Sequence, residues 1–210
     1  MTDDALPGIV ARLDEIAAQA KNGTHWSRDH YDRERFERIL QLTAELLASA
    51  LNERPASVTR WYTDEPGTIT SKVGVSVSTF DSDGRLLLVQ RRDNGRWAPP
   101  GGIVEYGETL ATAAAREALE ESGVHVRITK LIGIYETRRH GFKTIYSWQH
   151  VSFLAELLSG TPGPSDETLD VGYFTREQVA AMPLSSGHED PIQDAFAIYH
   201  HPATKTFFDT

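Results

Sequence analysis

The segment from Gly102 to Val124, GIVEYGETLATAAAREALEESGV, constrains the fold more than any other part of the chain. It predicts a glycine turn that leads into a helix, and the last two helical turns are rich in carboxylates. Glu117, Glu120 and Glu121 are spaced i, i+3 and i+4, so they share one face of the helix. Carboxylates at this spacing repel each other, and a hard divalent cation such as Mg²⁺ relieves the repulsion because it takes oxygen ligands. The segment therefore predicts a metal site.

The same segment resembles the Nudix box, a glycine, five residues, Glu, seven residues and then Arg-Glu-aliphatic-x-Glu-Glu-x-Gly-aliphatic. The matching positions are Gly102, Glu108, Arg116, Glu117, Glu120, Glu121, Gly123 and Val124. So many agreeing positions make the motif far more specific than a lone glycine motif. The alternative is a solvated, glutamate-rich helix face, which would not need the glycines at fixed positions.

The resemblance implies a role for each matching polar residue. Glu117, Glu120 and Glu121 would bind the metal ion, Mg²⁺ with Mn²⁺ as a possible substitute, and the carbonyl of Gly102 is a possible further ligand. Arg116 would orient the carboxylates by pairing with Glu117 or Glu108. Arg116 and Glu108 would therefore support the structure of the site.

Two further regions carry candidate residues outside the box. The general base in this family sits on the box or on a distal loop. Glu120 and Glu121 are therefore catalytic candidates within the box, and the acidic segment Ser165-Asp166-Glu167 provides candidates on a distal loop. Within that segment Glu167 is the first candidate and Asp166 the second, although acids in a surface loop are commonly only solvated. Arg91, at the end of a predicted strand, is expected to contact a substrate phosphate.

Composition narrows the class of protein. The chain has 210 residues and a net charge of −9, which argues against a general nucleic-acid surface. An anionic substrate would meet an anionic protein, so a metal ion must supply local positive charge. The absence of cysteine excludes disulfides and thiolate zinc sites. Without a signal peptide pattern or a long apolar run, we expect a cytoplasmic protein that does not enter membranes.

Residues 1–64 are predicted to be helical. Apolar residues recur at helical spacing up to Ala17, and Asn22-Gly23 suggests a stop. A second helix is expected after Asp32 as its N-cap. This region resembles the helical N-terminal extension of a Nudix subgroup that includes enzymes acting on CDP-choline and ADP-ribose. Two such helices bury little alone, so they pack on the following domain or on a second subunit, and we expect a homodimer.

Residues 65–210 are expected to form the Nudix hydrolase domain, beyond a joint at Trp61–Gly67. Strands are predicted from Lys72 and over 85–90, 131–137, 145–156 and 168–174. A capping box at Thr175–Gln178 predicts a short helix, and Asp190-Pro191 predicts the start of a last one. Beside it, His188-Glu189 is expected to be an exposed pair. The fold class is α/β (α+β), a Nudix-type mixed β-sheet sandwiched between helices, with a small helical N-terminal extension.

The predicted activity is metal-dependent hydrolysis of a diphosphate bond. The substrate would be a nucleoside diphosphate linked to another moiety, of the ADP-ribose or CDP-choline type, and the products a nucleoside monophosphate and a phosphorylated partner. A nucleoside triphosphate pyrophosphohydrolase is the alternative, because the box alone does not distinguish the two. A Nudix-like ligand-sensing regulator tends to lose box carboxylates, and a dimerisation scaffold leaves the glutamates unexplained. We expect a small-molecule nucleotide substrate and no nucleic-acid partner.

Overall fold

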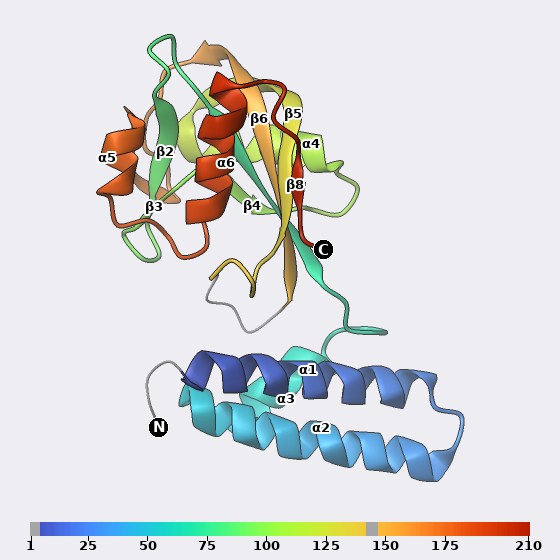
Figure 1. Cartoon of the computed structure of the whole chain (residues 1–210). Helices are drawn as coiled ribbons and strands as arrows, with labels where there is room; N and C mark the ends of the chain where they lie inside the picture. Colours follow the sequence, from blue (N-terminus) through green and yellow to red (C-terminus); the bar gives the residue numbers. More distant parts are fainter. Residues whose placement is uncertain (1–4, 142–146) are drawn as a thin grey trace. The chain divides into compact units, whose positions relative to one another are not determined.

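A computed structural model describes residues 5–141 and 147–210 of the chain. The chain divides into two compact units: the first covers the chain up to Ser71 and also takes in Ser147, and the second begins at Lys72. The first unit is helical and the second contains the sheets (Figure 1). In the described part of the chain, no helix combines the length and the apolar character needed to cross a bilayer.

Three helices form the first unit, and α1 and α2 lie side by side in it (Figure 1). Their bounds are α1 (Ala5–Trp26), α2 (His30–Leu51) and α3 (Pro55–Thr63). The core between them contains small alanines with larger side chains such as Leu47, Val58 and Tyr62. The hydroxyl of Tyr62 donates a 2.7 Å hydrogen bond to the buried carboxylate of Asp14, which ties α3 to α1.

The helix boundaries in this unit correct two predictions. Asn22-Gly23 does not end α1, which continues to Trp26. Gly23 serves packing instead, because a Cβ there would lie 2.5 Å from the ring of Phe36 on α2. The N-cap of α2 is Asp29 rather than Asp32, and its carboxylate accepts the N–H of Asp32 at 3.0 Å.

The helix α3 lies within the region predicted to be helical, and its last residues overlap the predicted joint. It has Pro55 at its first position, where the missing N–H costs nothing. Trp61, placed in the joint at Trp61–Gly67, is therefore helical, and the chain leaves the helix at Thr63.

Eight strands in the second unit form two sheets rather than one, counted over the described residues. The five-stranded sheet has the order β4-β1-β6-β5-β8, and its strands are β4 (Gly101–Ile103), β1 (Lys72–Thr79), β6 (Trp148–Gly160), β5 (Val124–Glu136) and β8 (Phe207–Phe208). The three-stranded sheet has the order β3-β2-β7, with β3 (Trp97–Ala98), β2 (Leu86–Arg91) and β7 (Thr168–Phe174). The parallel β1–β6 pair and the antiparallel β5–β6 pair make the larger sheet mixed.

Helices cover both sides of this unit (Figure 1). They are α4 (Leu110–Ser122), α5 (Arg176–Ala180) and α6 (Glu189–His200). Alanines of α4, including Ala113 and Ala118, are fully buried against strand residues such as Val75. Side chains of α6, including Phe196, form a second cluster with Leu86 and Leu88 of β2. The predicted sandwich of sheet between helices is therefore confirmed.

Several predicted boundaries in this unit shift. The strand predicted at 131–137 begins at Val124, directly after α4, and the predicted return strand 85–90 joins the smaller sheet. The last helix begins at Glu189 with His188 before it, two residues earlier than predicted. The capping box at Thr175 and Gln178 is present. Residues 145 and 146 of the strand predicted at 145–156 lie outside the described residues.

Candidate active site

The helix α4 has sharply defined ends. Thr109 caps its N-terminus, and the side chains and backbone of Thr109 and Thr112 exchange hydrogen bonds in a capping box. Gly123 ends the helix with φ of +74°, a left-handed conformation that favours glycine. Because both ends are fixed, the orientation of the glutamates in the last turns is fixed as well.

The three predicted metal ligands lie in two different environments. Glu117 and Glu121 are 7% and 5% exposed, whereas the side chain of Glu120 is 53% exposed. Burial raises the pKa of the Glu121 carboxyl to about 7 and also raises the pKa of Glu117. Both buried carboxylates are costly to ionise, and a bound cation would stabilise their charged forms.

The glycine pair before the helix brings backbone against these carboxylates. Gly101 and Gly102 belong to β4, which pairs with β1. The N–H of Gly101 donates a 2.9 Å hydrogen bond to Glu121 Oε2. A Cβ on Gly102 would lie 2.4 Å from Glu117 Oε1. Glycine at this position therefore gives the Glu117 carboxylate its space.

Arg116 holds most of the acidic side chains together. Its guanidinium bonds both oxygens of Glu108 at 2.8 and 3.0 Å, Glu117 at 2.9 Å and Glu120 at 2.8 Å. It also donates to the carbonyl of Ile103 at 3.1 Å. The hydrogen bonds to Glu108 contribute most to the raised pKa of Arg116. Arg116 thus acts as the counter-ion of the cluster.

The donors at this site are oxygens of the kind that hard divalent cations bind. Carboxylates of α4 and the backbone of Gly101-Gly102 are next to each other, as the 2.9 Å contact with Glu121 shows. Across the described ranges, no three acidic or histidine side chains already converge in a metal-binding arrangement. Glu117 and Glu120 are held by Arg116 instead. The chemistry of the donor set fits a divalent cation, because Glu117 and Glu120 each bond Arg116 through one oxygen and have a second oxygen for a metal.

Arg91 and Glu167 lie close to the same carboxylates. Arg91, the last residue of β2, forms a two-point ion pair with Asp93 at 3.0 and 2.9 Å. That pair is the main cause of its raised pKa, and the charges of Glu121 and Glu167 add to it. Glu167 also contributes to the raised pKa of Glu121. The fold therefore gathers Arg91, Glu121 and Glu167 from β2, α4 and the loop before β7.

His188 is buried, which corrects the prediction of an exposed His188-Glu189 pair. Its ring lies 5.4 Å from that of His150 on β6, and His150 Nε2 lies 2.9 Å from Ser76 Oγ on β1. Burial lowers the pKa of His150 to about 4 and that of His188 well below its usual value. Both rings are therefore neutral near pH 7. The polar sequence around His188 gave no signal of its burial.

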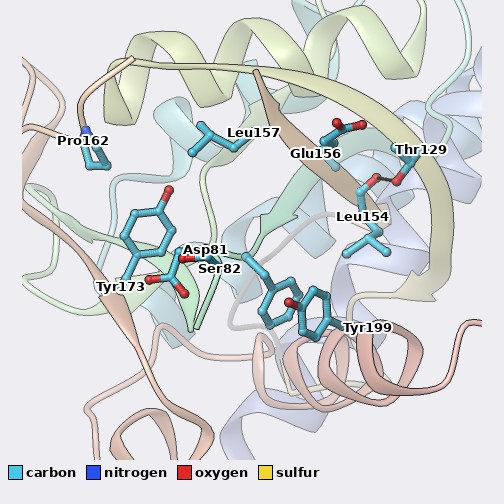
Figure 2. Close-up of a pocket in the computed structure, with 11 residues that line it drawn as sticks. Asp81, Ser82, Thr129, Leu154, Glu156, Leu157, Pro162, Tyr173 and Tyr199 are labelled. Atoms are coloured by element: carbon cyan, nitrogen blue, oxygen red, sulfur yellow. Dashed lines mark hydrogen bonds between the residues drawn. The ribbon is translucent and has the colours of Figure 1, made fainter. Parts of the chain in front are cut away.

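A cavity of about 640 Å³ opens elsewhere on this unit (Figure 2). Its walls include the stacked rings of Phe80 and Tyr199, together with Leu157 and Tyr173. Tyr173 belongs to the end of the β2–β7 ladder opposite to the Arg91–Thr168 pair. None of the predicted site residues lines this cavity.

Comparison with known proteins places this arrangement in a family. The model of the NUDIX domain matches residues 70–195, which include the whole acidic helix and the loop with Glu167. The chain belongs to the Nudix family. A second family model, the "UDP-X-like, N-terminal oligomerisation domain", matches residues 7–62.

A relative of known sequence extends the match over nearly the whole chain, and solved structures share its fold. "Putative ADP-ribose pyrophosphatase YjhB" of Bacillus subtilis is 29% identical over 203 residues, which is 95% of this chain and 96% of that protein. The crystal structure of an ADP-ribose pyrophosphatase from Streptococcus suis has 25% identity and a TM-score of 0.59, covering 67% of this chain and all of the other. The crystal structure of a UDP-X diphosphatase has the same fold, with 22% identity, a TM-score of 0.61 and coverage of 97% and 99%. This chain is a Nudix pyrophosphatase, and Nudix hydrolases generally use divalent cations.

Proposed function

We propose that this Nudix pyrophosphatase hydrolyses a nucleoside diphosphate linked to another moiety, of the ADP-ribose or CDP-choline type. The products are a nucleoside monophosphate and a phosphorylated partner. The observation that carries the proposal is the pair of buried carboxylates, Glu117 and Glu121, set against the Gly101-Gly102 backbone. The relative named as an ADP-ribose pyrophosphatase, which matches along nearly the whole chain, supports ADP-ribose as the first substrate to test.

The proposed cofactor is Mg²⁺, with Mn²⁺ as a substitute, held by Glu117, Glu120, Glu121 and the carbonyl of Gly102. When bound, the cation supplies the positive charge that a diphosphate needs in an acidic protein. Arg116 keeps the carboxylates oriented through its bonds to Glu117 and Glu120.

The remaining steps fall to side chains around the acidic helix. Glu167 is the proposed general base and takes a proton from the attacking water, with Glu120 and Glu121 as the catalytic residues of the helix. Arg91 binds a substrate phosphate, for which its guanidinium exchanges part of its ion pair with Asp93. The raised pKa of Arg91 keeps the guanidinium charged throughout.

The test is hydrolysis of a panel of substrates at fixed Mg²⁺, with products separated by chromatography. The panel contains ADP-ribose, CDP-choline, a UDP-sugar, NADH, a dinucleoside polyphosphate and nucleoside triphosphates. We expect release of the nucleoside monophosphate from ADP-ribose or CDP-choline. Preference for triphosphates would instead favour the alternative, a nucleoside triphosphate pyrophosphohydrolase, by the same site. Silence with every metal tried would contradict the enzyme mechanism and favour a ligand sensor.

The metal site is tested by the substitution Glu121→Gln. We expect kcat to fall by about 100-fold or more, since a charged donor next to the diphosphate is lost. Mg²⁺ should raise the melting temperature of the parent protein, because a ligand that binds only the folded state stabilises it, and this rise should shrink in Glu121→Gln. Glu53→Gln, which removes an exposed carboxylate from the helical unit, is the control. Equal Mg²⁺ responses in all three proteins would refute Glu121 as a ligand.

We also propose a homodimer formed through the helical unit. The match of residues 7–62 to an oligomerisation domain supports an oligomer. Large aliphatic side chains stay exposed on α1 and α2, namely Ile9, Ile16, Ile39, Leu42 and Leu46.

A further inference from the structure

Arg92 holds the loop before β7 by its main chain. Its guanidinium donates to the carbonyl oxygens of Asp166 at 2.7 Å, Thr168 at 3.1 Å and Ser165 at 3.3 Å. Its own backbone N–H donates to the carbonyl of Glu167 at 3.1 Å. One residue therefore binds four consecutive carbonyls, those of residues 165–168.

Two further contacts fix the same loop to the acidic helix. The buried hydroxyl of Thr168 donates to the carbonyl of Glu121 at 3.0 Å. The N–H of Gly163 donates to the carbonyl of Ser122 at 3.1 Å. The loop is therefore held between the end of β2 on one side and the end of α4 on the other.

The side chain of Glu167 depends on this backbone for its position. It is exposed, and among the described residues its carboxylate accepts no hydrogen bond, while its N–H donates to Ser165 Oγ at 3.1 Å. Its charge nevertheless contributes to the raised pKa values of Glu117 and Glu121. A small movement of the loop would thus change the distance between Glu167 and the acidic helix directly.

We propose that Arg92 is a positioning residue that holds Glu167 at the site where water is activated. The proposal rests on the proposed function, in which Glu167 is the general base. Arginine suits this task because its planar guanidinium spreads five N–H donors over three nitrogens and reaches several carbonyls at once, whereas the three donors of lysine share one nitrogen. Catalytic groups that move by about 1 Å lose up to about 100-fold in rate.

The decisive experiment is a double-mutant cycle on kcat with Arg92→Gln, Glu167→Gln and the combined variant, at saturating Mg²⁺ and with the substrate cleaved fastest in the panel. We expect Arg92→Gln to lower kcat about 10- to 100-fold with little change in KM, and Arg92→Lys to recover part of the loss. In the Glu167→Gln background, Arg92→Gln should change kcat less than about twofold. Equal factors in both backgrounds would overturn the proposal, because Arg92 would then not act through Glu167.

A second measurement follows the loop without any reference to activity. Amide hydrogen exchange of residues 165–168 should be about tenfold faster or more in Arg92→Gln, because the loop opens more often. Arg96→Gln is the matched control, since the Arg96 guanidinium donates to the carbonyl of Leu184 at 3.1 Å, outside this loop. Unchanged exchange in Arg92→Gln would refute the clamp.

The possible results distinguish a failure of Glu167 as the general base from a failure of Arg92 as the positioning residue. A Glu167→Gln variant with full kcat would overturn Glu167 as the base, and the positioning role would fall with it. A Glu167→Gln variant with low kcat beside an Arg92→Gln variant with full kcat would overturn the role of Arg92 alone and leave the proposed base in place.

Discussion

Gly102 lies so close to the carboxylate of Glu117 that a side chain at position 102 would occupy the same space. We expect Gly102→Ala to lower kcat about 10- to 100-fold, because the new methyl group would displace the Glu117 carboxylate by a distance that matters for catalysis. The melting temperature should change far less, since a flexible side-chain end can move. The kinetics of Gly102→Ala and of Gly163→Ala, whose Cβ would meet nothing within 4 Å, check this directly. Equal kcat values in both variants would contradict it.

For single residues, the sequence predicted which side chains belong to the site but not how buried each one is or what it contacts. The spacing of Glu117, Glu120 and Glu121 places them on one helical face, yet only the packing of that face against β4 leaves Glu120 exposed and the other two buried. Arg92 was missed because nothing in a lone arginine shows that its partners are carbonyls distant in sequence. His188 was misassigned because it packs against His150 of β6, a contact between residues distant in sequence.

At the level of secondary structure, α1 and α2 approach each other closely where Gly23 contacts the ring of Phe36. Alanine usually stabilises a helix relative to glycine by about 1 kcal/mol. We expect Gly23→Ala to lower the melting temperature instead, because its methyl group would meet the ring of Phe36. The double variant Gly23→Ala/Phe36→Leu should recover part of the loss. Thermal unfolding of the three proteins decides the matter, and a higher melting temperature in Gly23→Ala alone would be the contrary result.

His140 joins the loop after β5 to α6 and to the end of the chain. Its Nδ1 lies 2.7 Å from a carboxylate oxygen of Asp190, and its Nε2 lies 3.1 Å from one of Asp209. Desolvation acts to lower the pKa of His140, but the bonds to Asp190 and Asp209 outweigh it and raise the pKa above 6.5. Both nitrogens donate only in the charged ring.

The raised pKa of His140 sets the sign of a pH effect. A folded-state pKa above the unfolded value gives stability that is complete below pH 6.5 and is lost as the pH rises through the folded-state pKa. We therefore expect the melting temperature of the parent protein to exceed that of His140→Gln by more at pH 5.5 than at pH 8.5. Differential scanning fluorimetry at the two pH values measures this, and a constant difference would contradict it.

The helices and strands show which boundaries and pairings the sequence pattern predicts and which it does not. Thr168–Phe174 and the capping box at Thr175 were predicted to the residue, because turn and cap residues bound them. The start of β5 was missed because Val124–Lys130 follows the helix with no turn beyond Gly123. The division into two sheets was missed because alternation identifies a strand but not its neighbour.

For the whole molecule, the exposed apolar side chains of the helical unit predict how two copies meet. Ile39, Leu42 and Leu46 lie on one face of α2, and all three are more than two-fifths exposed. We expect Leu42→Glu/Leu46→Glu to convert the proposed homodimer into a monomer, because the buried charges would be unpaired. Light scattering after gel filtration measures the mass. The control Gln41→Glu adds a charge on the other exposed side of α2, and a monomeric parent protein would contradict the dimer itself.

In the described part of the chain, the hydrogen bonds that Arg92 donates to the loop go to main-chain oxygens of residues 165–168, and every residue type carries such an oxygen. The path of the loop is therefore largely independent of the side chains at positions 166 and 167. Those side chains can change, in evolution or by design, without a change in the backbone that positions them. The path of the loop and the chemistry of the residues that it carries can therefore be changed separately, so the proposed general base at position 167 can be replaced without moving the loop.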